Sequence, residues 1–323
     1  MRRITVIRLS SRGARRHGSG ASQSEHFVSF QAAPGFSQAP KSTIGKAPKD
    51  VPETTVQCYV IPEVVTAEEE RALIDFTSPW FDRLPYGDGH VDGLIHHYKE
   101  FYRPFTGLMT DDSYFEETAS ARKMVAASSN TSSSPSGRTI EGRSSLLQES
   151  VEESRMQCVR SALAMCRRIS TEHLPFIPVQ ERVHFLQLHG DGFIRAHTDE
   201  SRNSSGIVAG LTLGSGRVMS LTHKRFPGKR IDLLLAPRSF YVLCGAARHE
   251  WEHSVDWTVD DDEHLQRAMK SHVAEGSPVL FEGKPTGFTR GMRTAVIFRG
   301  LSPMDLLMQR MKEKEAAAAA LSR

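Results

Sequence analysis

The feature that most constrains the fold lies between residues 183 and 299. Here short runs rich in β-branched and aromatic residues alternate with turns built on glycine or proline. The runs are VHFLQLH, FIRAHTD, GIVAGLTL, RVMSLTH, RIDLLLA, SFYVLCG and RTAVIFR, separated among others by GDG, GSG, FPGK and PR. Such spacing is typical of an all-β sandwich or barrel, and about eight strands fit a jelly roll. We therefore predict a mainly β fold with flanking helices (α+β), built on a double-stranded β-helix (jelly-roll) core.

Helical patterns lie on both sides of this strand region. Thr66-Ala67-Glu68-Glu69 is a capping box that predicts a helix running through Phe76. Ser145 and Gln148 are expected to open a longer helix. Its apolar residues fall on one stripe: Leu147, Val151, Val159, Leu163 and Cys166. After Pro303 the run DLLMQRMKEKEAAAAAL is a strong helix former.

The net charge of +3 hides an uneven distribution. Residues 1–49 hold nine Lys or Arg and one acid, which gives +8, and the remainder holds 32 basic and 37 acidic residues, which gives −5. The first 24 residues contain six arginines, several serines and no acid. This composition is typical of a mitochondrial transit peptide, with a disordered basic tail or an RNA-binding arm as the alternatives. We expect location in the mitochondrial matrix and an acidic mature protein.

The composition divides the chain into three regions. We predict a presequence and disordered linker over 1–50, a main domain over 51–303 and a helical tail over 304–323. A serine-rich stretch at about 119–143 is expected to be a disordered insertion in the main domain. No run of about 18 apolar residues is present, so we expect no membrane span. We also expect a monomer.

The run FIRAHTD carries the first chemical signal. Successive side chains of a strand point to opposite faces, so His197 and Asp199 would project to the same side. With a second histidine they would make a 2-His-1-carboxylate triad, the ligand set of non-heme Fe(II) oxygenases. The candidates for that histidine are His249 and His253 in ARHEWEHSV. Other histidines are expected to be hydrogen-bonded structural residues: His96, His97, His184 and His189.

A strand near the end of the domain carries two arginines. Arg293 and Arg299 are six residues apart, which places both on one face, about 20 Å from each other at ~3.3 Å per residue. They could therefore hold opposite ends of a dicarboxylate that is chelated to a metal between them. Arginine suits this task, because its planar fork binds a carboxylate bidentately and keeps its charge when it is buried.

In this order, H-x-D, distal histidine and R-x-x-x-x-x-R, the chain resembles the AlkB family of Fe(II)/2-oxoglutarate dioxygenases, and its mitochondrial branch in particular. The resemblance is carried by IRAHTD, AGLTL, VMSLTH, SFYVLCGAARHEWEH and RGMRTAVIFR, and upstream by HVDGLIHHYKE. It covers roughly residues 56–302, with gaps at the serine insertion and at 256–288. LQLH at 186–189 lacks the asparagine and tyrosine that nucleic acid repair members carry there, which argues against nucleotide demethylation.

The resemblance implies a role for each candidate residue. The implied ligands of Fe(2+) are His197, Asp199 and His253. It also implies that Tyr241 and Arg293 bind the far carboxylate of 2-oxoglutarate, and that Arg299 lies at the metal end. O2 would be the second cosubstrate, and the reaction would release succinate and CO2 while a C–H bond is hydroxylated.

The substrate stays open at this point. The negative charge of the mature chain favours a protein or small-molecule substrate, and the resemblance implies a role in mitochondrial lipid metabolism or programmed necrosis. The alternative is a mitochondrial RNA (tRNA) demethylase, for which the basic turn between His223 and Arg230 is the motif. A third class, a catalytically silent jelly-roll binding module, is disfavoured because no ligand position is lost.

Overall fold

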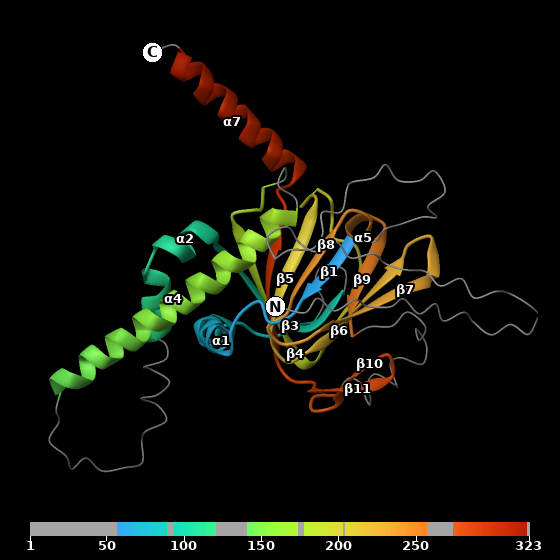
Figure 1. The fold of residues 1–323 in the computed structure, drawn as a ribbon, viewed down its shortest axis with the longest axis horizontal. Coiled ribbons are helices and arrows are strands. Elements are labelled where there is room, and N and C mark those ends of the chain that lie inside the picture. Colours follow the sequence, from blue (N-terminus) through green and yellow to red (C-terminus); the bar gives the residue numbers. More distant parts are fainter. Residues whose placement is uncertain are drawn as a thin grey trace, which may run out of the picture.

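The computed structural model describes residues 57–88, 94–120, 141–173, 178–202, 204–256 and 274–321. In this part of the chain ten strands form one antiparallel sheet that curls into a nearly closed, jelly-roll-like body (Figure 1). These strands are β1 (Gln57–Ile61), β2 (Gly87–Asp88), β3 (Ile95–Pro104), β4 (Arg182–His197), β5 (Ile207–Gly214), β6 (Arg217–His223), β7 (Phe226–Leu235), β8 (Phe240–Cys244), β9 (Trp251–Val255) and β12 (Arg293–Arg299). The main path is β1-β8-β5-β12-β4-β9-β6-β7, and β3 pairs with β4 and β2. The expected mainly β fold with flanking helices is confirmed.

Helices lie against this sheet or extend from it. They are α1 (Ala67–Asp82), α2 (Phe105–Thr110), α4 (Glu141–His173), α5 (Ala246–His249) and α7 (Pro303–Leu321). A separate hairpin joins β10 (Pro278–Phe281) to β11 (Lys284–Thr289). None of the helices among the described residues is long and apolar enough to cross a membrane. Residues 1–50 and 121–140, on which the predicted presequence and most of the serine-rich insertion fall, lie outside the described residues.

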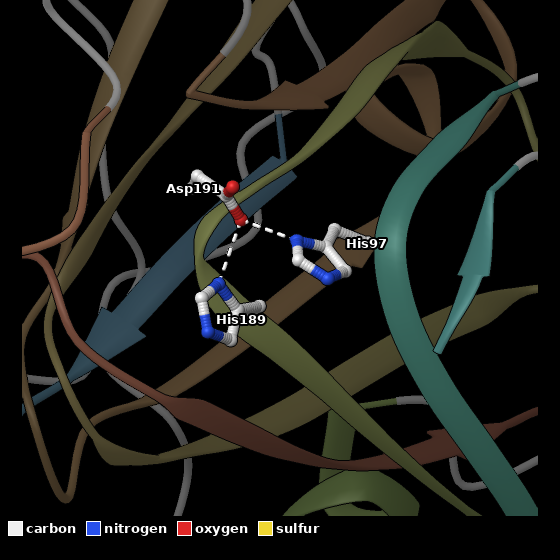
Figure 2. A group of neighbouring side chains, drawn as sticks. All are labelled: His97, His189 and Asp191. Atoms are coloured by element: carbon white, nitrogen blue, oxygen red, sulfur yellow. Dashed lines mark hydrogen bonds and ion pairs between the residues drawn. The ribbon is translucent and has the colours of Figure 1, made fainter. Parts of the chain in front are cut away.

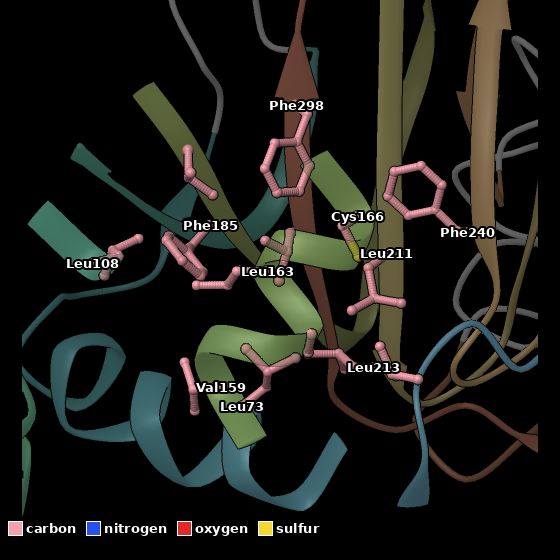
Figure 3. Packing of buried hydrophobic residues seen from close by; sticks show 14 of the residues in the cluster. Leu73, Leu108, Val159, Leu163, Cys166, Phe185, Leu211, Leu213, Phe240 and Phe298 are labelled. Atoms are coloured by element: carbon pink, nitrogen blue, oxygen red, sulfur yellow. The ribbon is translucent and has the colours of Figure 1, made fainter. Parts of the chain in front are cut away.

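The two faces of β12 belong to two different hydrophobic clusters. Val296 and Phe298 pack toward α1 and α4, whose buried residues include Leu73 and Leu163 (Figure 3). Ala295 and the residues in step with it face the interior of the curled sheet. The side chains of Arg293 and Arg299 share that inner face, because successive residues of a strand alternate. The helices therefore cover the outer face, and the candidate chemistry lies inside.

The three predicted helices are present as α1, α4 and α7, with a change of boundary in α4. The capping box of α1 is present: Thr66 N donates to Glu69 Oε2 at 2.8 Å, and Glu69 N donates to Thr66 Oγ1 at 3.1 Å. The long helix α4 begins at Glu141, four residues before the predicted start. Its stripe is buried at Val159, Leu163 and Cys166, but Val151 is 57% exposed. That end of the helix extends beyond the sheet, as Figure 1 shows.

Three strand boundaries differ from the sequence prediction. GDG at 190–192 does not separate two strands, because β4 continues through it with an irregularity in its pairing. β4 ends at His197, so Asp199 does not lie on the strand. The FPGK segment, predicted as a turn, belongs to β7, and the hairpin turn lies at Lys224–Arg225 instead. At GDG and at FPGK, pairing with a neighbouring strand prevails over the local turn preference of glycine and proline.

Candidate metal centre

Three side chains from β4, the segment that follows it and the adjacent strand β9 meet at one end of β4. His197 is the last residue of β4, Asp199 follows it, and His253 lies opposite His197 in the ladder with β9. Asp199 Oδ1 lies 3.3 Å from His197 Nε2 and 3.9 Å from His253 Nε2. Two ligands about 2.1 Å from a metal ion at a right angle stand about 3 Å apart, so this spacing leaves room for an ion between them.

The orientation of His197 suits metal binding. His197 Nδ1 donates a hydrogen bond to the carbonyl oxygen of Arg195 at 2.9 Å, which leaves Nε2 to face Asp199 and His253. Metal-binding histidines commonly donate their other ring N–H to a carbonyl or carboxylate, because this bond fixes the tautomer and the ring orientation. The sequence prediction placed His197 and Asp199 on one face of a strand. The structure instead brings them together across the strand end.

The charges of this cluster favour an ionised Asp199 and a neutral His253. Burial alone would raise the pKa of Asp199, but the hydrogen bond with His197 and the charge of Arg299 hold it well below its ordinary value. Burial and the neighbouring His197 lower the pKa of His253 to about 3. A carboxylate and a neutral imidazole are the protonation states in which Asp199 and His253 would ligate a metal. Burial would lower the pKa of His197, but the hydrogen bond to Asp199 raises it, and a bound ion would take the place of that proton. The donor set therefore fits a divalent ion such as Fe(II).

Arg299 connects this cluster to a second layer of polar residues. Its Nε donates to Asp199 Oδ2 at 3.3 Å, and its Nη1 donates to His184 Nδ1 at 2.8 Å. His184 Nε2 in turn donates to Glu100 Oε2 at 2.8 Å. Burial is the main cause that lowers the pKa of His184, to about 4, so the ring stays neutral and can accept from Arg299. His184, expected to be a structural histidine, is thus a positioning residue for Arg299.

Arg248 fixes the backbone that follows β4. This side chain is 2% exposed, and its Nη1 donates to the carbonyl oxygen of Asp199 at 2.8 Å. Its Nη2 donates to Ser204 Oγ at 2.9 Å, so one guanidinium ties both ends of the loop after β4. Sequence patterns alone do not point to Arg248, which directly precedes the candidate His249 in ARHEWEH. Its only sequence signal is a lone arginine in the short helix α5.

Arg293 is a buried cation with little compensation. It is 2% exposed, its Nη2 donates to Thr212 Oγ1 at 3.2 Å, and its Nε has no hydrogen-bond partner among the described residues. Tyr241, which is 5% exposed, lies close enough for its charge state to couple to Arg293, Arg299 and Asp199. Burying a guanidinium without a full set of acceptors is costly. The unpaired N–H of Arg293 is therefore available to donate a hydrogen bond to a bound anion.

The remaining sequence candidates lie elsewhere. His249 is exposed on α5 and does not join the cluster, so the structure brings His253 rather than His249 to His197. In the basic turn, Lys224 Nζ donates to the carbonyl of His249 at 2.9 Å, and Arg230 Nε contacts Asp232 at 2.8 Å. Two of the basic side chains are therefore already occupied by the protein itself.

Comparisons with known proteins agree with the resemblance. No protein-family model matches the chain. It is 41% identical over 73 residues to "Alpha-ketoglutarate-dependent dioxygenase alkB homolog 7, mitochondrial" of Bos taurus, which is 23% of this chain and 33% of that protein. The Mus musculus protein of the same name is 40% identical over the same length. The match thus spans about a third of the length of these relatives, which are named as mitochondrial AlkB homologues.

Solved structures overlap the chain more broadly but less closely. A Pseudomonas putida prolyl-4-hydroxylase has a TM-score of 0.37 at 10% identity, covering 77% of this chain and 94% of the other. The structure of OsALKBH1 has a TM-score of 0.38 at 13% identity, covering 75% of this chain and 97% of the other.

Proposed function

We propose that this chain is an Fe(II)- and 2-oxoglutarate-dependent dioxygenase of the AlkB type, with 51–303 as its catalytic domain. The observation that carries the proposal is one arrangement: a convergent His197, Asp199 and His253 beside Arg299, with the buried and incompletely paired Arg293 on the same face of β12. A metal site and a separate anion site lie along the same face of β12. This arrangement suits a cosubstrate that binds the metal at one end and carries a carboxylate at the other.

Each residue has a distinct task in this proposal. His197, Asp199 and His253 hold the ion, and Arg293 with Tyr241 binds the far carboxylate of 2-oxoglutarate. Arg299 keeps Asp199 ionised and aimed, and is itself held by His184. Bound Fe(II), with 2-oxoglutarate and O2 as cosubstrates, supplies the oxidising chemistry that yields succinate, CO2 and a hydroxylated product. The chain contributes position and charge.

The test is succinate formation by the purified full chain supplied with iron, 2-oxoglutarate and ascorbate. His197→Ala should abolish this uncoupled turnover, because it removes one of three ligands. His249→Ala is the matched control, since His249 is exposed on α5 and outside the cluster, and it should keep full turnover. Unchanged succinate formation by His197→Ala would refute the assignment. No turnover by the wild-type chain would favour a silent binding module.

We further propose a protein or small-molecule substrate in the mitochondrial matrix, with a role in lipid metabolism or programmed necrosis. The support is the −5 charge after residue 49, the acid-poor first 24 residues and the mitochondrial names of the matched relatives. The substrate is best sought by trapping from mitochondria on the inactive, iron-substituted protein, with mass spectrometry of what is retained. Steeply salt-dependent RNA binding by protein lacking residues 1–50 would instead favour the RNA demethylase alternative.

A further inference from the structure

The pairing of β3 with β4 is interrupted at one place. Tyr98 pairs with Leu188 and His96 pairs with Phe193, so His97 alone lies opposite the four residues 189–192. This is a large β-bulge, a feature that commonly re-aims side chains. Its backbone is tightly fitted, since a Cβ atom on Gly192 would lie 2.8 Å from the carbonyl oxygen of His97, which itself has a φ of 53°.

The bulge gathers a second group of metal-type ligands. Asp191 Oδ1 lies 2.6 Å from His97 Nδ1 and 2.7 Å from His189 Nδ1, and Figure 2 shows both rings aimed at the carboxylate. The side chains are 31%, 27% and 45% exposed for His97, His189 and Asp191, so a small ion can reach them from solvent. The Tyr86 ring makes T-shaped contacts with both imidazoles, with centroids 4.6 and 5.3 Å away.

Buried arginines hold the bulge in this shape. Arg217 Nη2 donates to the carbonyl of His189 at 3.2 Å, and Arg290 donates to the carbonyls of Gly190 and Gly192, both at 3.1 Å. The two arginines are 0% and 4% exposed, and both pair with Asp256, at 2.9 and 2.6 Å. The backbone of residues 189–192 is thus held in place before an ion binds, which lowers the conformational entropy lost on binding.

The sequence at the bulge repeats the pattern of the first centre. His189-Gly190-Asp191 has the same H-x-D spacing as His197-Thr198-Asp199, eight residues later. In both groups the second histidine comes from an antiparallel neighbour of β4: His253 from β9 in one, and His97 from β3 in the other. Two ligand sets of the same composition therefore lie along one strand.

We propose that His97, His189 and Asp191 form a second metal site, which takes a divalent transition-metal ion such as Zn²⁺ and joins β3 to β4. Imidazole nitrogen and carboxylate oxygen are ordinary zinc ligands, and water can complete a tetrahedron. The role is structural, because Arg217 and Arg290 are already bound to backbone carbonyls and Asp256 and do not offer a site for an anionic substrate.

Binding requires only small changes. At present His97 Nδ1 and His189 Nδ1 each lie at hydrogen-bond distance from Asp191 Oδ1. Two ligand atoms of one metal ion lie about 3 Å apart, so each imidazole has to move away from the carboxylate by only a few tenths of an ångström. Each imidazole then carries its proton on Nε2. For His189 that atom already lies 3.7 Å from Glu275 Oε2, and this exposed side chain can move closer to accept a hydrogen bond from it. A carboxylate behind a ligating histidine raises its basicity and fixes its ring.

The test uses the full chain with the first centre removed, the double variant His197→Ala/His253→Ala. Calorimetric titration with Zn²⁺ should give one ion per chain, and zinc at 100-fold excess over Kd should raise Tm by about 5 °C or more. Adding Asp191→Asn should abolish both effects. Adding His96→Ala, at the neighbouring histidine outside the ligand set, should leave both unchanged.

Two outcomes would overturn the proposal: no zinc bound by the double variant, or one zinc still bound after Asp191→Asn. If Asp191→Asn does not fold, as judged by circular dichroism, His97→Asn makes the same test at the other strand. The readouts are binding and stability rather than turnover. A negative zinc result therefore refutes the second metal site without bearing on the proposed dioxygenase. A negative succinate result in turn leaves the zinc-binding test of the second site unaffected.

Discussion

Gly210 lies directly opposite Tyr241 in the ladder between β5 and β8, and a Cβ atom at position 210 would stand 2.7 Å from the phenolic oxygen. Only glycine leaves space for the ring to lie over this strand. Tyr241 is buried, so its ring has little freedom to move aside. The glycine of AGLTL is therefore needed for a side-chain contact rather than for a turn.

Gly210→Ala should displace the Tyr241 ring and weaken 2-oxoglutarate binding. We expect KM for 2-oxoglutarate to rise about tenfold, which corresponds to the loss of about one hydrogen bond to a charged group. Steady-state kinetics of uncoupled succinate formation measures this. Gly291→Ala is the control, because a Cβ there meets its nearest neighbour, Ser215 Cβ, at an ordinary 3.9 Å. Equal KM values for the two variants would exclude Tyr241 as a cosubstrate contact.

Arg293→Met should lower the affinity for 2-oxoglutarate without lowering the free energy of unfolding. Removing the guanidinium takes away the partner proposed for the far carboxylate, so affinity for 2-oxoglutarate should fall at least tenfold. The free energy of unfolding should stay equal or rise by about 1 kcal/mol, because a buried cation with an unpaired Nε is replaced by an apolar chain of similar length. Titration calorimetry and urea unfolding measure the two quantities. A large loss of stability with intact binding would contradict the assigned role.

His184 should make the fold sensitive to acid. Its pKa is lowered by burial to about 4 in the folded chain from an ordinary value of 6.5, so the unfolded chain binds the proton first. The stability from this group is complete above pH 6.5 and is lost as pH falls toward 4, by about 3 kcal/mol in all. Urea unfolding at several pH values should show a shallower decline for His184→Asn. Identical slopes would show that His184 is not buried as a neutral ring.

The outer core should depend on the buried stripe of α4. Leu163 is 0% exposed, and truncation to alanine should lower the free energy of unfolding by about 2–5 kcal/mol through lost burial and a residual cavity. Val151 on the same helix is 57% exposed, and Val151→Ala should change it by no more than about 0.5 kcal/mol. Denaturant unfolding of both variants checks this. Similar losses would mean that the two ends of α4 pack alike.

Strand alternation and turn residues were sufficient to predict the curled sheet and the shared face of Arg293 and Arg299, and the capping box predicted helix α1. They failed at GDG, where β4 continues as a bulge instead of turning. A glycine pair around an aspartate is locally compatible with both outcomes. The arginines that decide between them, Arg217 and Arg290, come from distant parts of the chain.

The sequence by itself determined the residue types and the order of the proposed site: an H-x-D pair, a later histidine and two arginines in step on one strand. Only the tertiary structure decided that Asp199 reaches His197 from beyond the strand, held by Arg248 and Arg299. It alone also decided that His97 and His189, expected to be structural histidines, meet at Asp191. The physical reason is that local periodicity fixes which face a side chain takes, whereas convergence of three ligand atoms depends on strand register and on buried charges far apart in sequence.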